Sequence, residues 1–350
     1  MNERARDVLH AAEPRRVLCD TDLRGAELRA VDLRGWTLQR VRLDAADLHE
    51  ARLDEALLAS CSLQDASLEQ GGLERALLLD CDLRQARLSD CRARAATLRR
   101  CRLQGTCWAR ACLQGATLQQ CEHARADYRE ADLGRCALAD ADLHEACLRG
   151  ARLGAAQLHG ALLQGQDLRD CDLQACDLRH AVLRECRLDG MRLLRTQLLG
   201  ADLQHAALGH AELDSVQLQH ASLRHARLHG ARLSQVHAAG ADLEGLQADA
   251  SLWRRCVLRH ACWRGARLRD ARLERCDLSF ADLDDADLGG AELHDVLLHG
   301  CEQDRLRADA ARRVRCHETD EALLQAQRWK PPPIGPRADA DPPHHKEPMP

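Results

Sequence analysis

Aromatic residues and lysine are scarce in this chain of 350 residues. Phe, Trp and Tyr together make up 2% of the composition. The only lysines are Lys330 and Lys346, close to the C-terminus. A core built on aromatic rings, which often dominate the packing of globular domains, is therefore excluded. The composition suits an interior that is too narrow for rings.

Long apolar runs are also missing. The N-terminal stretch "MNERARDVLHAAEPRR" has charges throughout and no apolar run of signal-peptide length. No later stretch is long and apolar enough to span a membrane. We therefore predict a cytoplasmic protein with no membrane contact, and export by a specialised, non-Sec secretion system stays open.

The usual catalytic signatures are absent from the sequence. It contains no H-E-x-x-H, G-x-S-x-G, G-x-x-x-x-G-K-[ST] or C-x-x-C motif. These motifs place zinc ligands, a nucleophilic serine, a phosphate-binding loop or a redox pair. We predict that the protein is not an enzyme and has no catalytic residue, no cofactor and no metal site.

Neither sign of charge dominates. The chain has 50 Lys and Arg against 55 Asp and Glu, which gives a formal net charge of −5. A nucleic-acid-binding protein usually carries a marked excess of positive charge. We therefore expect no direct nucleic-acid binding.

Leucine recurs at every fifth residue from Leu18 to Leu298, without insertion or deletion. Five residues advance an α-helix by about 500°, which spreads the leucines round its whole surface. On a continuous strand the odd period would send them to alternate faces. They can share one interior only if the backbone turns a corner in each unit. Of the 57 positions 49 are Leu, and the exceptions are Ala93, Trp108, His123, Tyr128, Ala238, Ala248, Trp253 and Trp263.

Units such as "ADLHE" at 46–50, "ADLQH" at 201–205 and "ADLDD" at 281–285 follow the pattern A-(D/N)-L-x-x. On these units the chain resembles the pentapeptide-repeat family over about residues 16–300. The resemblance implies an all-β fold, a right-handed quadrilateral parallel β-helix with four units, or about 20 residues, per coil. We predict an N-terminal cap over 1–15, the β-helix over 16–303, a C-terminal helical cap over 304–329 and a disordered Pro-rich tail over 330–350.

The residue two before each Leu is nearly always small and should point inward, because side chains alternate along a strand. Twelve of the 18 cysteines stand at this position, where free Cys acts as a compact apolar residue. Cys61, Cys81, Cys101 and Cys121 are each separated by one four-unit coil and should stack along the interior. We interpret them as inert thiols, the alternative being a redox or metal ladder.

Other columns with the spacing of one coil lie on the surface. We interpret Glu185, His205 and His225 as solvated turn residues rather than a metal site, which needs a fuller ligand set. Two stretches that depart from the repeat, 91–130 and 236–265, are where we expect a bend or bulge. Charge alternates along one column and should brace the rod: Asp132, Arg152, Asp172, Arg192, Glu212 and Arg232.

A neighbouring column carries no charge from Thr37 to Gln157. Beside each other on this face, Leu57, Ala59, Leu77 and Leu79 should form an exposed apolar cluster of the kind that marks a docking surface. Two interpretations stay open. Either a protein partner docks on this patch, or the N-terminal segment covers it.

These observations predict a rigid, non-enzymatic scaffold whose flat faces bind an unidentified protein partner. By analogy with long members of the family, it is accessory to a bacterial secretion system such as type VI. The alternative is a DNA mimic that binds or protects DNA gyrase or another topoisomerase, a role the family fills with strongly electronegative rods. Arginines at 152, 192 and 232 interrupt the acidic column here. A homodimer through a face or an end coil is a further prediction.

Overall fold

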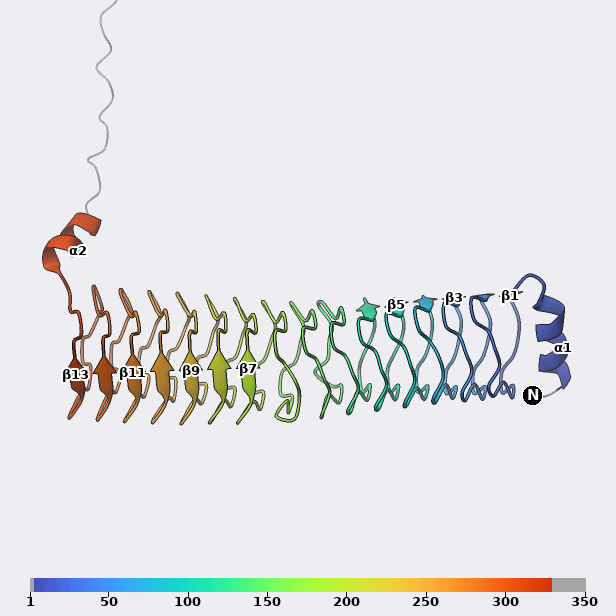
Figure 1. Ribbon diagram of the computed structural model, residues 1–350, viewed down its shortest axis with the longest axis horizontal. Helices are drawn as coiled ribbons and strands as arrows, with labels where there is room; N and C mark the ends of the chain where they lie inside the picture. Colours follow the sequence, from blue (N-terminus) through green and yellow to red (C-terminus); the bar gives the residue numbers. More distant parts are fainter. Residues whose placement is uncertain (1–2, 329–350) are drawn as a thin grey trace, which may run out of the picture.

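The computed structural model describes residues 3–328 as a long rod with a helix near each end (Figure 1). The rod is a parallel β-solenoid of about 15 turns. Each five-residue unit contributes one residue to a backbone ladder, then an inward side chain, then a two-residue turn. The predicted parallel β-helix is confirmed.

Within residues 3–328, thirteen short strands and two helices are regular enough to be named. Helix α1 comprises Glu3–Ala12 and helix α2 comprises Glu321–Arg328. Strands β1 to β6 form one parallel sheet and β7 to β13 form a second. The strands are β1 Val17–Cys19, β2 Thr37–Gln39, β3 Leu57–Ala59, β4 Leu77–Leu79, β5 Thr97–Arg99, β6 Thr117–Gln119, β7 Arg192–Leu194, β8 Glu212–Asp214, β9 Arg232–Ser234, β10 Leu252–Arg254, β11 Arg272–Glu274, β12 Glu292–His294 and β13 Arg312–Val314.

Backbone hydrogen bonds explain why the chain turns once per unit. The Leu23 N–H donates to the Arg42 carbonyl oxygen of the next coil at 2.8 Å, and the Ala26 N–H closes the turn on the Leu23 carbonyl oxygen at 3.1 Å. The corner residue Gly25 has a φ of +63°. Ala45 adopts the same left-handed conformation with a φ of +54°, which costs an L-residue about 1–2 kcal/mol. Its N–H bonds to the next coil at 2.7 Å and offsets part of this cost.

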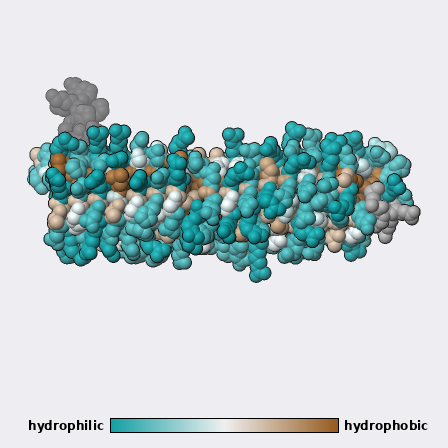
Figure 2. Space-filling model, turned by 60° about the horizontal axis from the view of Figure 1, so that its bottom comes forward, coloured by the Kyte–Doolittle hydropathy of each residue, from teal (hydrophilic) through white to brown (hydrophobic). Residues whose placement is uncertain are grey.

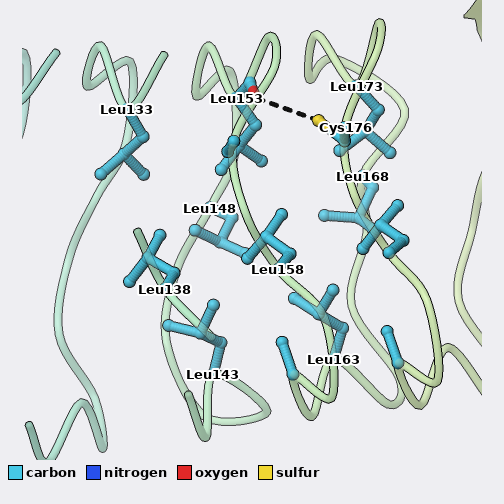
Figure 3. Close-up of a cluster of buried hydrophobic side chains, with 14 of the residues drawn as sticks. Leu133, Leu138, Leu143, Leu148, Leu153, Leu158, Leu163, Leu168, Leu173 and Cys176 are labelled. Carbon is cyan, nitrogen blue, oxygen red and sulfur yellow. Dashed lines mark hydrogen bonds between the residues drawn. The ribbon is translucent and has the colours of Figure 1, made fainter. Parts of the chain in front are cut away.

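The leucines form one continuous core along the rod. Those of the series from Leu18 to Leu298 are at most 4% exposed, and Figure 3 shows a section in which they point into the interior from every side. Ala or Cys usually occupies the small inward position. The Cys176 thiol donates to the Leu153 carbonyl oxygen of the preceding coil at 2.9 Å. A satisfied thiol can therefore replace alanine in this apolar interior.

The tryptophans at 253 and 263 stay inside the rod without bending it. Their ring centroids lie 5.3 Å apart in an edge-to-face arrangement, and the sheet pairing on both sides of β10 is continuous. Ala238 and Ala248 stand in the same coil at positions that hold Leu elsewhere. Their small volume offsets the extra volume of the rings, as a close-packed interior requires. The expectation of a bend over 236–265 is wrong.

The atypical stretch 91–130 places Trp108 and Tyr128 inside the rod, 0% and 1% exposed. His123 fills another inward position, and its Nδ1 lies 2.8 Å from the Tyr128 hydroxyl oxygen. Burial lowers the pKa of His123 to about 4, so the imidazole is neutral at pH 7. Its Nε2 has no hydrogen-bond partner among the described residues. This buried polar pair lies beside the first irregularity of the ladder.

Within the described rod, the ladder is interrupted once on each of three successive faces. Residues 122 and 142 do not pair, nor do 147 and 167, nor 172 and 192, although their columns are paired before and after. Each break lies five units after the last, one unit more than a full coil, so the interruption moves round the rod by one face per coil. The fourth face stays paired from Thr117 to Gln157. In Figure 1 this is the middle of the rod, where no strand arrows are drawn and one sheet gives way to the other.

Gln166 occupies a small inward position beside the second break and supplies a replacement donor. Its side-chain Nε2 donates to the carbonyl oxygens of Leu143, His144 and Ala146 at 3.0, 2.9 and 2.8 Å. In regular coils, backbone N–H groups of neighbouring coils bond the oxygens at the positions of His144 and Ala146. The amide thus compensates for part of the broken ladder, since an unpaired buried carbonyl costs about 1–3 kcal/mol.

Helix α1 closes the N-terminal end of the solenoid (Figure 1). Leu9 is 7% exposed and joins the core, and Val8 and Ala12 pack against it. An open end coil would offer an unpaired backbone edge to other chains. Helix α1 lies against this end, at the position where a cap over 1–15 was predicted.

The C-terminal end differs from the predicted helical cap over 304–329. The solenoid continues to His317, whose N–H donates to the Val296 carbonyl oxygen at 2.9 Å, and only α2 is helical. Backbone hydrogen bonds to the preceding coil keep the residues before α2 in the solenoid, although leucine no longer fills the inward positions there. The predicted disordered tail over 330–350 lies outside the described residues.

Inward positions of this last coil have no further coil beyond them. Arg313 and Glu318 occupy two such positions and form an ion pair of 2.8 Å between Nη1 and Oε1. Polar side chains are tolerated here because they reach water. The polar sequence that suggested a helix therefore marks the end of the solenoid.

Leu58 and Leu57 provide a matched test of the inward and outward assignment. Leu58→Thr should lower the free energy of unfolding by about 3 kcal/mol, because it removes packing at a site that is 0% exposed and buries a hydroxyl. Leu57→Thr should change it by less than about 0.5 kcal/mol, since Thr37 and Thr97 already stand in that outward column. Denaturant unfolding followed by circular dichroism measures both. Equal losses at the two sites would contradict the assignment.

The role of Gln166 can be tested by removing its amide. Gln166→Leu should lower the free energy of unfolding by about 2 kcal/mol, since buried carbonyl oxygens lose their donor. Gln174→Leu, at an exposed position of the next coil, is the control and should cost less than about 0.5 kcal/mol. Amide hydrogen exchange should quicken around residues 143–146 in the first variant only. Unchanged exchange there would show that the amide does not support the break.

Candidate protein-docking site

The predicted patch lies where two strands of the first sheet run side by side. Leu57 pairs with Leu77, and Ala59 pairs with Leu79, across β3 and β4. All four side chains point outward and are half-buried, while the leucines between them are inward. The structure therefore brings the four predicted residues together as one surface cluster.

This patch is part of a longer surface without charge. Each coil contributes one outward residue to this ladder column, and that residue is uncharged in every coil from position 37 to position 157. Arg99 is the one charged residue in the column beside it over the same strands. We call the surface the uncharged face and define it by Thr37, Gln39, Leu57, Ala59, Leu77, Leu79, Thr97, Thr117, Gln119, Ala137, Ala139 and Gln157.

Charged residues at the corner beside this face neutralise one another. Arg40 forms a two-bond ion pair with Asp20, with Nε–Oδ1 and Nη2–Oδ2 distances of 2.6 and 2.7 Å. Arg100 pairs with Asp80 in the same way, at 2.6 Å for both bonds. Hydrogen bonds from these arginines hold the pKa of each carboxyl group below its usual value. These two pairs are therefore neutral at pH 7, and over residues 3–328 the charges on this side that make no ion pair are Arg99 and Asp140, one of each sign.

A groove of about 570 Å³ lies at the far end of the uncharged face. It opens beside β6, next to the first break in the ladder, and Thr117, Ala137 and Gln157 line it. The sequence analysis did not predict this groove. The groove lies beside a break in the pairing between coils, and no single residue type indicates such a break. The groove gives the otherwise flat face a recess.

Cys121 and His159 also line the groove, which raises the question of nucleophilic chemistry. No hydrogen bond joins the two side chains in the described part of the chain; His159 Nδ1 lies 3.9 Å from an oxygen of Asp177 instead. Contact with Cys101 and burial raise the pKa of the Cys121 thiol. A protonated thiol without an adjacent base is a poor nucleophile, so the groove is better suited to binding than to catalysis.

The N-terminal segment does not cover the patch. Described residues 3–12 form α1, which lies across the end of the rod rather than over β3 and β4 (Figure 1). The patch side chains keep part of their surface exposed. For the described residues, the alternative that the N-terminal segment covers Leu57 and Leu77 is therefore wrong.

The predicted columns of thiols and histidines are present. All 18 cysteines are free, and Cys61, Cys81 and Cys101 each donate to a leucine carbonyl oxygen of the preceding coil at 3.4 Å. Burial raises the pKa of Cys176 and of Cys186 to about 12. Cys176 and Cys186 therefore stay protonated at pH 7.

Among the surface histidines, His205 and His225 stack with ring centroids 5.3 Å apart. His180 lies over the next corner, where a Cβ on Gly200 would come within 2.6 Å of its Nδ1. Gly200 therefore leaves room for the His180 ring, whereas His205 and His225 accommodate each other by stacking. The rings are therefore packed as turn residues.

One group of metal-ligating side chains escaped the sequence analysis. Asp242, Glu244 and Cys262 have ligand atoms within 4.8 Å of one another. Arg224 Nη1 lies 3.3 Å from an oxygen of Asp242 and 2.7 Å from an oxygen of Glu244. The guanidinium already supplies the positive charge that a metal would bring. The signal in the sequence was a pair of carboxylates at alternate positions with a thiol one coil later, which appears only once the coil length is known.

The alternating charge column is paired on either side of the third break but not across it, because residues 172 and 192 do not pair. Asp132 stands beside Arg152 on the next coil, and Arg192 beside Glu212. Arg192 and Glu212 form an ion pair of 3.1 Å between Nε and Oε2. Exposed pairs of this kind contribute about 0–1 kcal/mol each, so the column reduces repulsion rather than holding the rod together.

Most of the surface is polar. Figure 2 shows a side of the rod on which hydrophilic residues dominate along the whole length, with hydrophobic residues in small groups between them. Over residues 3–328, no helix is both long and apolar enough to cross a membrane.

Comparison with known proteins agrees with this architecture. Solved structures similar to the chain include HetL, a pentapeptide repeat protein involved in heterocyst differentiation regulation from the cyanobacterium Nostoc sp. strain PCC 7120, at 26% identity over 83% of this chain and 96% of that chain, with a TM-score of 0.25. Full-length QnrB1, a plasmid-mediated fluoroquinolone resistance protein, is 15% identical over 80% of this chain and 92% of that chain, with a TM-score of 0.19. Rfr23 from the cyanobacterium Cyanothece 51142 is 17% identical over 50% of this chain and 99% of that chain, with a TM-score of 0.16. Among curated proteins, none matches the chain.

The family model described as pentapeptide repeats matches the chain in eight copies, over residues 37–71, 76–120, 111–154, 156–193, 176–213, 211–245 and 254–290. These matches cover most of the solenoid. The chain therefore belongs to the pentapeptide repeat family.

Proposed function

We propose that this pentapeptide repeat protein is a non-enzymatic scaffold that binds another protein through the uncharged face. The observation that carries the proposal is the continuity of this face. It runs from β2 past β6 without a charge in its ladder column, on a chain in which 30% of the residues are charged. Apolar surface left in water is unfavourable by about 25 cal/mol per Å². A partner that covers Leu57, Leu77 and Leu79 would recover this free energy.

The rigidity of the solenoid favours the same function. A rod whose coils are bonded to both neighbours loses little conformational entropy when its surface is covered, so more of the contact free energy remains for binding. The partner should present an uncharged, largely apolar surface with a protrusion that fits the groove beside β6. A bacterial secretion apparatus such as a type VI system is the setting we propose for it, supported by family resemblance alone.

Topoisomerase protection by DNA mimicry is the competing function, and the arginines count against it. A protein that mimics DNA needs unpaired negative charge. Many carboxylates here instead form ion pairs with an arginine one coil away, as Asp20 does with Arg40 and Asp285 with Arg305. A gyrase supercoiling assay with a fluoroquinolone separates the two functions. We expect no protection of supercoiling activity at any concentration of the protein, and protection would overturn the scaffold proposal.

Reversing the character of the patch should abolish partner binding without unfolding the rod. The variant carrying Leu57→Arg and Leu77→Arg should bind the partner at least tenfold more weakly, because two guanidinium groups would lose water on binding. Its thermal stability should stay within a few degrees of the original, since Leu58 and Leu78 remain buried. Partners are first identified by photo-crosslinking from position 79, and affinity is then measured with the purified partner.

The matched control is Leu162→Arg with Val182→Arg. These residues also pair on neighbouring coils and are half-buried and outward, but they lie on a different face. This control should bind the partner normally. Equal binding by both double variants would remove the uncharged face as the docking site.

A further inference from the structure

A groove of about 830 Å³ runs along the second sheet near the C-terminal end of the solenoid. The residues that line it come from five successive coils, from Ser234 in the first to Arg315 in the last. Six of them are arginines and three carry carboxylates. We call it the arginine groove and define it by Arg254, Arg255, Arg272, Arg275, Arg312 and Arg315.

Each carboxylate of the arginine groove is already paired with one of its arginines. Glu274 Oε2 lies 2.9 Å from Nε of Arg254, and Glu292 Oε2 lies 2.8 Å from Nη2 of Arg272. The third carboxylate, Asp295, accepts two hydrogen bonds of 2.6 and 2.9 Å from the arginine at 315. These three pairs are neutral, so they leave the charge of the groove to the other arginines.

Three arginines of the groove make no ion pair among residues 3–328, and all three are exposed: Arg255, Arg275 and Arg312. Arg312 lies three coils beyond Arg255, which is about 14 Å at the coil spacing of about 4.8 Å. The groove therefore presents three free positive charges to solvent along this length.

Two of these arginines also break a rule that the corners of the rod otherwise follow. Each corner residue lies beside the corner residue of the next coil, as Asp80 does beside Arg100, 20 positions later. From position 20 to position 315, with His counted as neutral, charged corners that are neighbours in this way have opposite signs, except for Arg255 and Arg275. Like charges at adjacent positions are destabilising, and proteins break such local rules mainly at functional sites. A bound anion would relieve the repulsion.

We propose that the arginine groove binds an extended acidic segment of a partner protein. Side chains on one side of an extended chain recur every second residue, about 6.7 Å apart, so three acidic residues at alternate positions span about 13 Å. This span matches the distance along the rod from Arg255 to Arg312. A guanidinium group also suits a carboxylate in shape, because it donates two parallel hydrogen bonds to it.

The density of charge in the groove disfavours a nucleic acid. A DNA duplex carries one negative charge per about 1.7 Å and a single strand one per about 3.4 Å. Over about 14 Å these are about eight and about four charges, against three free arginines and three carboxylates. The bases of a single strand usually stack on aromatic side chains, and none of the described residues that line the groove is Phe, Trp or Tyr. An acidic protein segment is the better match.

A short labelled peptide in which Glu alternates with Thr tests the proposal. Charges interact over about 30 Å at 0.01 M ionic strength but over only about 3 Å at 1 M. Fluorescence anisotropy with the full chain should therefore show binding at the lower salt and release at the higher salt. The same peptide with Gln in place of Glu should not bind at either salt. Failure of the Glu peptide to bind at the lower salt would overturn the proposal.

Removing the three free charges should weaken this binding. The variant with Arg255→Gln, Arg275→Gln and Arg312→Gln should bind the Glu peptide about tenfold more weakly, because three exposed charge pairs together account for about this change in affinity. Its thermal stability, followed by circular dichroism, should not fall, since the side chains are exposed and a like-charge contact is removed.

The matched control makes the same change in net charge elsewhere on the rod. It carries Arg52→Gln, Arg92→Gln and Arg135→Gln, at exposed arginines that make no ion pair among the described residues and lie at least six coils from Arg255. It should bind the Glu peptide as the original chain does. Equal weakening in both triple variants would overturn the proposal, because net charge rather than the groove would then decide the affinity.

Two further measurements separate the groove from other kinds of site. Single-stranded oligothymidylate should bind more weakly than the Glu peptide at the same salt, and tighter binding would overturn the proposal in favour of a nucleic-acid partner. The variant with Leu57→Arg and Leu77→Arg should bind the Glu peptide normally, since the uncharged face lies on the other sheet. The peptide experiment therefore succeeds or fails independently of the docking function.

Discussion

The backbone ladder between coils is the constraint on which the rest of the structure depends. Each unit uses its N–H and C=O groups on the coils before and after it and on one turn, as Leu23 does with Arg42 and Ala26. This leaves little freedom in the path of the chain, and the corner residue must adopt a left-handed conformation even where it is not glycine. The interior is then one width throughout. Leucine fills it, and a pair of tryptophans enters where neighbouring leucines have become alanine.

Because the path is so regular, the surface is a direct map of the sequence read coil by coil. Residues that are distant in the chain become neighbours at about 4.8 Å, so any bias in composition becomes a stripe. The uncharged face and the alternating charge column are such stripes.

The backbone ladder between coils is interrupted in the middle of the rod. Its three breaks move round the solenoid by one face per coil, and they separate the sheet of β1 to β6, which carries the uncharged face, from the sheet of β7 to β13. Gln166 and the pair of His123 and Tyr128 are polar residues at inward positions close to these breaks. Gln166 donates to backbone oxygens beside the second break, whereas His123 and Tyr128 pair with each other. The groove beside β6 opens next to the first break.

The sequence by itself determined the repeat and the inward and outward assignment, because leucines at every fifth residue share one interior only if the backbone turns once per unit. The patch at Leu57, Ala59, Leu77 and Leu79 also needed the four-unit coil that the family resemblance implied. The sequence analysis placed the C-terminal cap too early and a bend at 236–265 wrongly, because residue type alone does not show whether a neighbouring coil provides backbone partners or space. Only the tertiary structure decided that α1 leaves the patch exposed, that the ladder breaks between residues 122 and 192, and that a groove opens there. These features depend on how whole coils stack. The stacking of coils depends on many weak pairings together, so it cannot be predicted from any single residue.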